Sequence, residues 1–107
     1  MQVFATADND IDALPTRDAQ SIARFFQILS DPTRVRLVKA LADGKWCVSD
    51  LAHALEMDQP AISHQLKYLR EMGLVNWERM GRHVYYTLDN PLLQNTLMSV
   101  MGALDSE

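Results

Sequence analysis

Apolar residues recur along most of this chain at the spacing of helices, and along one segment at the spacing of strands. Apolar positions that repeat with the helical period form one face of a helix. They predict helices over about residues 17–29, 32–43, 50–55, 59–72 and 91–104. Residues 46–48, 74–79 and 82–88 contain β-branched and aromatic side chains and predict extended structure, with the last two stretches forming a β-hairpin.

Polar residues, prolines and glycines mark the ends of these elements. Pro32 and Pro91 each lie where the first turn of a helix tolerates proline, directly after a capping residue. Gly44 and Gly73 follow the second and fourth helices as stop residues, and Gly81 supplies the positive φ that a tight hairpin turn at Met80-Gly81 needs. The predicted helix caps are Asp31, Ser49, Asp58 and Asn90.

The order of the predicted elements is helix, helix, short strand, helix, helix, hairpin, helix. Two helices joined by a few residues form a helix-turn-helix unit, and a hairpin directly after it makes a winged helix-turn-helix. The fold class is therefore mainly α with a small β-hairpin wing. We expect one domain over residues 17–105, because a chain of 107 residues suits a single domain. Residues 1–16 are polar and are expected to form a flexible acidic arm.

The charge of the chain is unevenly distributed. The net charge is −4, which by itself does not suggest a partner as acidic as DNA. Residues 1–20 hold four aspartates against one arginine, whereas residues 59–88 hold one lysine and three arginines against two glutamates. The basic charge therefore lies on the fourth helix and the hairpin, and this segment would face phosphates.

The fourth helix has one apolar and one polar face. A helix that reads DNA needs one face that packs and another that enters the major groove. Residues at the start of such a helix reach deepest, so Gln59, Ser63 and His64 are the expected base contacts. The alternative is an ordinary solvated helix face. The polar face carries Pro60, Ser63, His64, Lys67 and Glu71, with Gln59 and Arg70 at its edge.

The hairpin that follows carries basic side chains near its tip. Arg79, Arg82 and His83 are suited to a contact with the DNA backbone or the minor groove. His83 has a structural alternative, a histidine that bonds to the hairpin itself. Tyr85 and Tyr86 alternate between the two faces of the strand, so one is expected in the core and the other near phosphate.

Several linked motifs in this order resemble the ArsR/SmtB family of bacterial repressors. The resemblance runs from about Phe25 to Leu88 and implies a dimeric winged-helix repressor of an inverted-repeat operator, which an inducer, often a metal ion, releases from DNA. The motifs are Leu29-Ser30-Asp31-Pro32-Thr33-Arg34, Cys47-Val48-Ser49-Asp50-Leu51-Ala52, Gln59-Pro60-Ala61-Ile62-Ser63-His64-Gln65-Leu66-Lys67-Tyr68-Leu69-Arg70, Gly73-Leu74-Val75 and Gly81-Arg82-His83-Val84-Tyr85-Tyr86.

The resemblance also implies that the first and last helices form a homodimer interface. The apolar stripe of each helix gives the expected contacts, and an apolar C-terminal helix of this kind needs a partner. The alternative is that the last helix only covers the core of its own subunit. The expected interface residues are Ile22, Phe25, Phe26, Leu29, Leu93, Leu97, Val100 and Leu104.

The chain departs from both metal sites that recur in the family. The first uses a Cys-Val-Cys-Asp-Leu pattern, and here Ser49 takes the place of the second cysteine. Soft ions prefer several thiolates, and the chain has one cysteine. The second site uses Asp and His on the last helix, which here has no histidine; Asp89 and Asn90 alone cannot make a tetrahedral zinc site. We therefore expect no metal cofactor, and the inducer stays open.

A metal- or thiol-responsive sensor remains the second hypothesis. Cys47 and His53 lie six residues apart and form a candidate ligand pair, with Asp8 or Asp10 of the arm as a third ligand. The alternative for Cys47 is a buried apolar side chain. A thiol switch would normally need a resolving cysteine, and Cys47 is the only one.

Other functional classes have less support in the sequence. Three histidines and scattered carboxylates show no nucleophile–base or paired-acid arrangement, so we do not expect an enzyme. No apolar run is long enough to span a membrane, and the first residues lack the pattern of a signal peptide. The single cysteine fits a reducing cytoplasm, the expected location. A winged helix that binds proteins instead of DNA is the third hypothesis, which the intact polar face of the fourth helix argues against.

Overall fold

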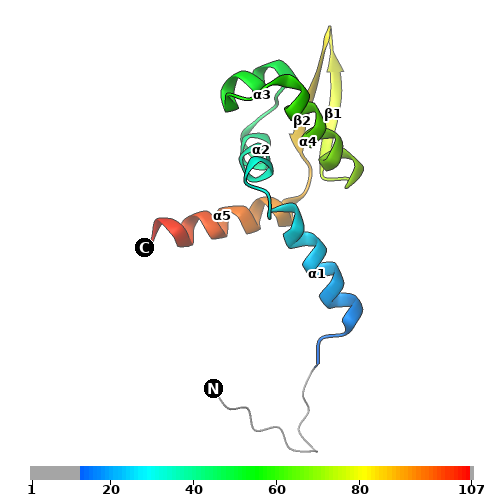
Figure 1. The fold of residues 1–107 in the computed structure, drawn as a ribbon, viewed down its shortest axis with the longest axis vertical. Helices are drawn as coiled ribbons and strands as arrows, with labels where there is room; N and C mark the ends of the chain where they lie inside the picture. The colour runs from blue at the N-terminus through cyan, green and yellow to red at the C-terminus, as the bar shows by residue number, and fades with distance from the viewer. Residues whose placement is uncertain (1–12, 107) are drawn as a thin grey trace, which may run out of the picture.

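The computed structural model describes residues 13–106 and has the predicted order of elements (Figure 1). It confirms a mainly α winged helix-turn-helix with a two-stranded antiparallel hairpin, which we call the wing. Residues 1–12 of the predicted arm lie outside the described residues. The elements are α1 Thr16–Ile28, α2 Pro32–Asp43, α3 Val48–Leu55, α4 Gln59–Glu71, β1 Val75–Met80, β2 His83–Leu88 and α5 Pro91–Asp105.

One apolar core joins α2, α3, α4 and the first half of α5. Each of these helices turns its apolar stripe inward, and burial of that surface is the main favourable term in folding. α1 contributes only Ile28 to the fully buried set, and Figure 1 shows α1 and α5 leaving the body in different directions. The fully or almost fully buried side chains of the core include Leu37, Val38, Leu41, Leu51, Ile62, Leu66, Leu69, Leu93 and Leu97.

Three of the four predicted caps are confirmed. The side-chain oxygens of Asp31, Asp58 and Asn90 accept hydrogen bonds from the backbone N–H three residues further on, at 3.0, 2.8 and 2.9 Å. The prediction for Ser49 was wrong, because α3 begins at Val48 and Cys47 is its N-cap. The Cys47 backbone carbonyl already accepts the first helical bond from the N–H of Leu51 at 3.0 Å, which places Ser49 inside the helix.

The glycines predicted to end α2 and α4 and to form the turn of the wing differ in backbone conformation. Gly73 and Gly81 have φ values of 72° and 65°, the left-handed region that a side chain disfavours. Gly44 has a φ of 174°, so α2 ends in extended backbone and not in a left-handed cap. The turn of the wing lies at Gly81-Arg82, one residue later than predicted, because Met80 still pairs with His83.

The wing is attached to the body through a short bridge. Trp46 and Tyr86 exchange two backbone hydrogen bonds, of 3.1 and 2.8 Å, which add one residue of a third strand to the hairpin. The indole N–H of Trp46 also donates to the backbone carbonyl of Ala40 in α2, at 2.9 Å. The wing is therefore tied through Trp46 to α2. Within residues 13–106 no helix is both long and apolar enough to cross a bilayer.

Candidate nucleic-acid interface

The packing of α4 determines which of its side chains face solvent. Ile62, Leu66 and Leu69 point into the core, and each is at most 2% exposed. The opposite side of a helix is then necessarily outward. All five predicted contact residues of this helix are exposed, namely Gln59, Pro60, Ser63, His64 and Lys67.

A first hollow joins the start of α4 to the tip of the wing. It has a volume of about 350 Å³, and we call it the wing-tip hollow. Gln59 from α4 lines it together with Arg82 and His83 from the wing. Residues separated by more than 20 positions in the sequence thus line one surface. Its remaining lining residues are Cys47, Val48, Ser49, Val84 and Tyr86.

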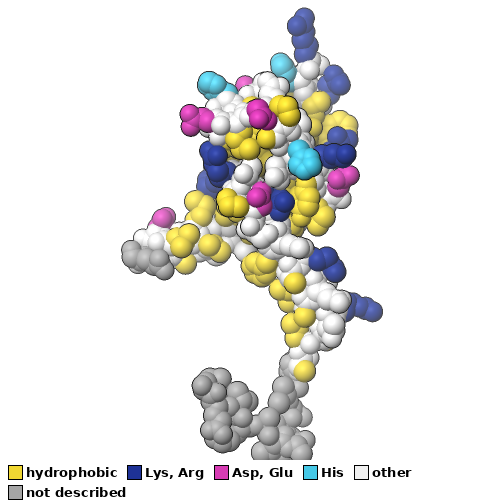
Figure 2. All heavy atoms as spheres, viewed as in Figure 1, with side chains coloured by type: hydrophobic (Ala, Val, Ile, Leu, Met, Phe, Trp, Pro, Cys, Tyr) yellow, Lys and Arg dark blue, Asp and Glu magenta, His cyan; other side chains and the backbone are white. Residues whose placement is uncertain are grey.

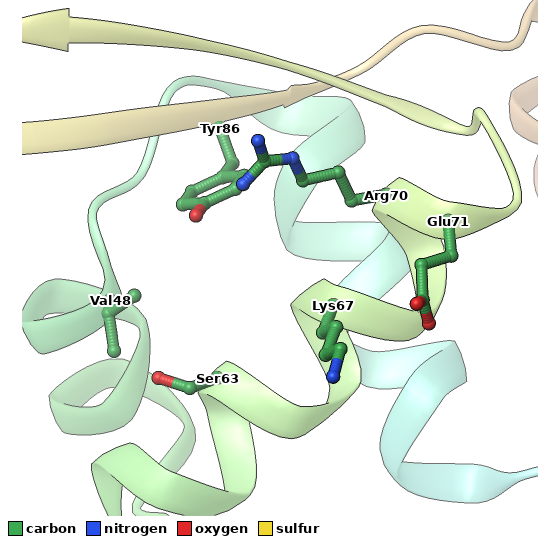
Figure 3. Close-up of a pocket in the computed structure, with 6 residues that line it drawn as sticks. All are labelled: Val48, Ser63, Lys67, Arg70, Glu71 and Tyr86. Atoms are coloured by element: carbon green, nitrogen blue, oxygen red, sulfur yellow. The ribbon is translucent and has the colours of Figure 1, made fainter.

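A second hollow continues along α4 toward its C-terminal end. It has a volume of about 550 Å³, and we call it the helix–wing hollow. Figure 3 shows Ser63 and Lys67 lining it from α4, Val48 from α3 and Tyr86 from the wing. Arg70 and Glu71 complete its lining at the end of α4. The two hollows share Val48 and Tyr86, so they form one continuous surface between α4 and the wing.

Arg70 lines this surface and was not among the predicted contacts, and Trp77 of β1 packs against it. The guanidinium carbon of Arg70 lies 4.4 Å from the centroid of the Trp77 ring. A cation over an aromatic face is attracted by the ring quadrupole, so Trp77 holds Arg70 beside the wing. The position of Arg70 at the edge of the polar face was the only signal in the sequence. The partnership with β1 depends on tertiary structure.

The cations of this surface are available for an anionic ligand. Among residues 13–106, the ion pairs are Lys39–Asp43 and Lys45–Glu78, and neither involves a residue of α4. Lys67 and Arg82 of this surface, and Arg79 on β1 beside it, are exposed and form no ion pair within the described part of the chain. Figure 2 shows basic side chains along the wing and beside α4. Positive charge along one face is typical of surfaces that bind nucleic acid.

The remaining predicted contacts lie next to the hollows. Pro60, His64 and Arg79 are exposed but line neither hollow. The His83 ring packs edge-on against Tyr85, with 6.3 Å between ring centroids, and His83 is exposed. Tyr86 packs against the core and also lines both hollows, so one tyrosine takes part in both the core and this surface.

The structure divides the predicted dimer residues into two groups. Leu93 and Leu97 are 0% and 5% exposed and pack in the core of their own chain, which leaves little of their surface for a partner. Phe25 and Leu29 are half-buried against the same core. The exposed members are Ile22, Phe26, Val100 and Leu104. Three further apolar residues on or next to these helices are also exposed and were not predicted, namely Leu14, Leu92 and Met98.

The candidate metal ligands Cys47 and His53 are not assembled into a site. Cys47 is buried, its Sγ lies 3.3 Å from the Oγ of Ser49, and it lines the wing-tip hollow. His53 is exposed and lines a different hollow with Glu56 and Met57. Within the described residues, no group of three His, Cys, Asp or Glu side chains is arranged to hold a metal ion. The arm residues Asp8 and Asp10 lie outside this range.

Comparison with known proteins identifies the family. The model of the arsR family of bacterial regulatory proteins matches residues 31–76, from the N-cap of α2 into β1. The transcriptional repressor SmtB homolog of Synechocystis sp. is 46% identical over 86 residues, which cover 80% of this chain and 65% of that protein. The chain thus spans slightly less than two thirds of this relative's length.

Solved structures agree with this assignment. The solution structure of apo-NmtR has a TM-score of 0.78 and 32% identity, and the match covers 97% of this chain and 88% of that one. The crystal structure of the AntR antimony-specific transcriptional repressor has a TM-score of 0.82 and 28% identity, over 99% and 96% of the two chains. The SmtB homolog and AntR are both named transcriptional repressors. The chain therefore belongs to the arsR family of bacterial regulatory proteins.

Proposed function

We propose that this protein is a transcriptional repressor that binds a specific duplex DNA operator. The observation that carries the proposal is the wing-tip hollow, which Gln59 of α4 lines together with Arg82 and His83 of the wing. An amide side chain at the start of a helix is suited to a base edge in the major groove, because it forms paired hydrogen bonds with adenine. Basic residues at a wing tip are suited to the phosphates that flank it.

The division of roles along α4 and the wing follows from the same geometry. Gln59, Ser63 and His64 lie on the exposed side of the first half of α4 and are the proposed base contacts. Pro60 adds apolar surface beside them. Lys67 lies one turn beyond Ser63 in the helix–wing hollow, and Lys67, Arg79, Arg82 and His83 are the proposed backbone contacts.

We propose that the repressor acts as a homodimer formed by α1 and α5. The Phe26 side chain is 53% exposed and that of Leu104 is 61% exposed, although both are apolar. Figure 2 shows hydrophobic side chains along both helices where they extend from the body. A cluster of exposed apolar residues on helices that leave the core is typical of an interface with another chain. A dimer also matches an inverted-repeat operator, since protein two-fold symmetry is mirrored in the DNA.

We further propose that both usual metal sites of the family are missing. Ser49 replaces one thiolate of the first site, and its hydroxyl contacts Cys47. α5 contains no histidine for the second site. The inducer, if the repressor has one, would then act through other residues.

Salt dependence of duplex binding tests the main proposal. The logarithm of the binding constant should fall linearly with the logarithm of salt concentration, with a slope of about −0.9 per phosphate contact. Arg82→Ala should flatten this slope by about one contact. Arg24→Ala is the matched control, because Arg24 is an exposed cation on α1, where it donates to the Ser21 Oγ at 3.3 Å.

The result distinguishes the proposal from its main competitor. Wild type that shows no salt-dependent duplex binding would contradict DNA recognition and favour a winged helix that binds other proteins. An equal change of slope for Arg82→Ala and Arg24→Ala would remove the wing tip from the interface.

A further inference from the structure

A single arginine connects the end of α1, the start of α2 and the middle of α4. Arg34 lies in the first turn of α2 and is half-buried. Its Nη1 donates hydrogen bonds to the backbone carbonyls of Gln27 and Ile28, both at 3.1 Å. Its Nε donates to the Oε1 of Gln65 in α4 at 3.2 Å. The last carbonyls of a helix lack partners within the helix, and Arg34 donates to two of them at the end of α1. The Gln27 carbonyl also accepts from the N–H and the Oγ of Ser30, at 3.2 and 2.6 Å.

Gln65 and Tyr68 complete this connection from the side of α4. The Nε2 of Gln65 donates to the Oδ2 of Asp31 at 3.2 Å, and the same oxygen accepts the capping hydrogen bond from the Arg34 N–H at 3.0 Å. The Arg34 guanidinium carbon also lies 3.9 Å from the centroid of the Tyr68 ring. Two side chains of α4 therefore contact a guanidinium that is itself bound to the end of α1. We call Asp31, Arg34, Gln65 and Tyr68 the α1–α4 clamp.

The clamp differs in kind from the rest of the contact between α4 and the core. Ile62, Leu66 and Leu69 pack by apolar contact, which is not directional and permits small rotations and slides. Hydrogen bonds weaken steeply when their angles depart from linear, and the planar guanidinium presents its donors in a rigid fork. The clamp therefore adds directional contacts that resist a change in the angle between α4 and α1.

This orientation matters in a dimer built on α1. In a symmetric helix-turn-helix dimer, the two recognition helices must enter major grooves about one helical turn apart, roughly 34 Å. Figure 1 shows α1 extending away from the part of the molecule that holds α4. A small rotation at the junction of these helices is consequently enlarged at the exposed face of α4.

We propose that Arg34 is a positioning residue for DNA recognition, which sets the angle between α1 and α4 and thereby the half-site spacing that the dimer accepts. The proposal rests on the proposed function, since it requires operator binding by a dimer. It assigns a role to Arg34 in the Asp31-Pro32-Thr33-Arg34 motif, of which Asp31 and Pro32 were explained by the start of α2. Arg34 itself is not proposed to touch DNA.

Two variants remove the directional bonds with little change in volume. Gln65→Met keeps a flexible side chain of similar size and loses the hydrogen bonds to Arg34 and Asp31. Arg34→Lys keeps the positive charge and loses the planar guanidinium that donates to both Gln65 and the α1 carbonyls. Lys39→Met is the matched control, since Lys39 also lies on α2 but pairs with Asp43 and not with α4.

The experiment compares operators that each protein selects from random duplex DNA. Gln65→Met and Arg34→Lys should bind the wild-type operator about tenfold more weakly, as expected when only about a tenth of the free protein holds α4 at the angle that the operator requires. They should also select half-sites with a broader distribution of spacings than wild type. Their urea-unfolding midpoints and sedimentation should show that the protein is folded and dimeric at the temperature of the binding assay. Lys39→Met should select the wild-type spacing.

The outcomes separate this inference from the proposed function. If the wild type binds and both clamp variants select the same spacing with the same affinity, the positioning role is overturned and DNA binding stands. Weaker binding with unchanged spacing, in parallel with lower stability, would show a purely structural role and would also overturn it. If the wild type binds no duplex DNA, the proposed function fails first. Should Arg34→Lys not fold, Gln65→Met decides the outcome alone.

Discussion

The guanidinium carbon of Arg70 lies 4.4 Å from the ring centroid of Trp77, which links the last turn of α4 to the first strand of the wing. The contact holds a cation in the wall of the helix–wing hollow, next to Tyr86 and one turn from Lys67. It connects two elements that are both proposed to contact DNA.

The first prediction concerns this pair. Arg70→Ala should flatten the salt dependence of duplex binding by about 0.9 in the log–log slope, as expected for one lost phosphate contact. Trp77→Ala should weaken binding about two- to fivefold, because an exposed cation–π contact is worth about 0.5–1 kcal/mol. Trp77→Phe should retain part of the affinity. Binding titrations at several salt concentrations measure both effects, and unchanged slopes for all three variants would show that the pair only supports the wing.

Base recognition and backbone contact should separate within α4. Gln59→Ala should lose about 1–3 kcal/mol of discrimination at one operator position, because the amide is proposed to pair with a base edge. Lys67→Ala should instead weaken binding to all sequences alike and lower the salt slope by about one contact. Affinities measured over a library of single-base operator variants distinguish the two patterns. A uniform loss in Gln59→Ala would assign Gln59 to the backbone.

The turn between α3 and α4 contains a strained residue that the sequence did not reveal. Glu56 has a φ of 55°, a left-handed conformation that costs a non-glycine residue about 1–2 kcal/mol. Glycine loses about 0.5–1 kcal/mol in chain entropy on folding, so Glu56→Gly should raise the free energy of unfolding by about 0.5–1 kcal/mol. Chemical denaturation measures this gain.

Glycine at an ordinary helical position supplies the control for this prediction. Gln94 is exposed in the first half of α5, where Gln94→Gly should destabilise the protein by about 1 kcal/mol. A lower stability for Glu56→Gly as well would show that the turn does not store strain at residue 56.

Two apolar residues with opposite exposure test the dimer surface. Phe26→Asp should shift the protein from dimer to monomer, because Phe26 is 53% exposed on α1 and would place a charge in the proposed interface. Leu93→Ala should instead lower the stability of the subunit by about 2–5 kcal/mol, since Leu93 is fully buried in its own core. Sedimentation and denaturation distinguish these effects. A dimer that survives Phe26→Asp would exclude this face of α1.

Replacement of the only cysteine tests the sensor hypothesis. We expect As(III) to leave operator affinity unchanged in the wild type and in Cys47→Ser, because soft ions prefer several thiolates and each chain has one. Competition assays with Zn(II), Ni(II), Cu(I) and As(III) measure operator release. Release from the wild type but not from Cys47→Ser would establish Cys47 as a ligand or redox group and contradict the proposal that the usual sites are missing.

The sequence by itself determined the elements and their order, because these depend on local patterns. The spacing of apolar residues predicted five helices and a hairpin, and Asp31, Asp58 and Asn90 marked helix starts through short-range hydrogen bonds. The exposed face of α4 could also be predicted, since a helix that buries Ile62, Leu66 and Leu69 must expose the residues between them. Ser49 was assigned the wrong role because its side chain suits a cap, whereas the chain turns at Cys47.

Tertiary structure alone decided which distant residues meet. Leu93 and Leu97 continue the same apolar stripe as Leu104, and only the packing of α5 shows that the first two belong to the core while the third stays exposed. The pairing of Arg70 with Trp77, and the hydrogen bonds from Arg34 to α1 and α4, join residues from different elements. Periodicity describes each element separately, whereas these contacts depend on the angles at which the elements pack, and those angles are properties of the whole fold.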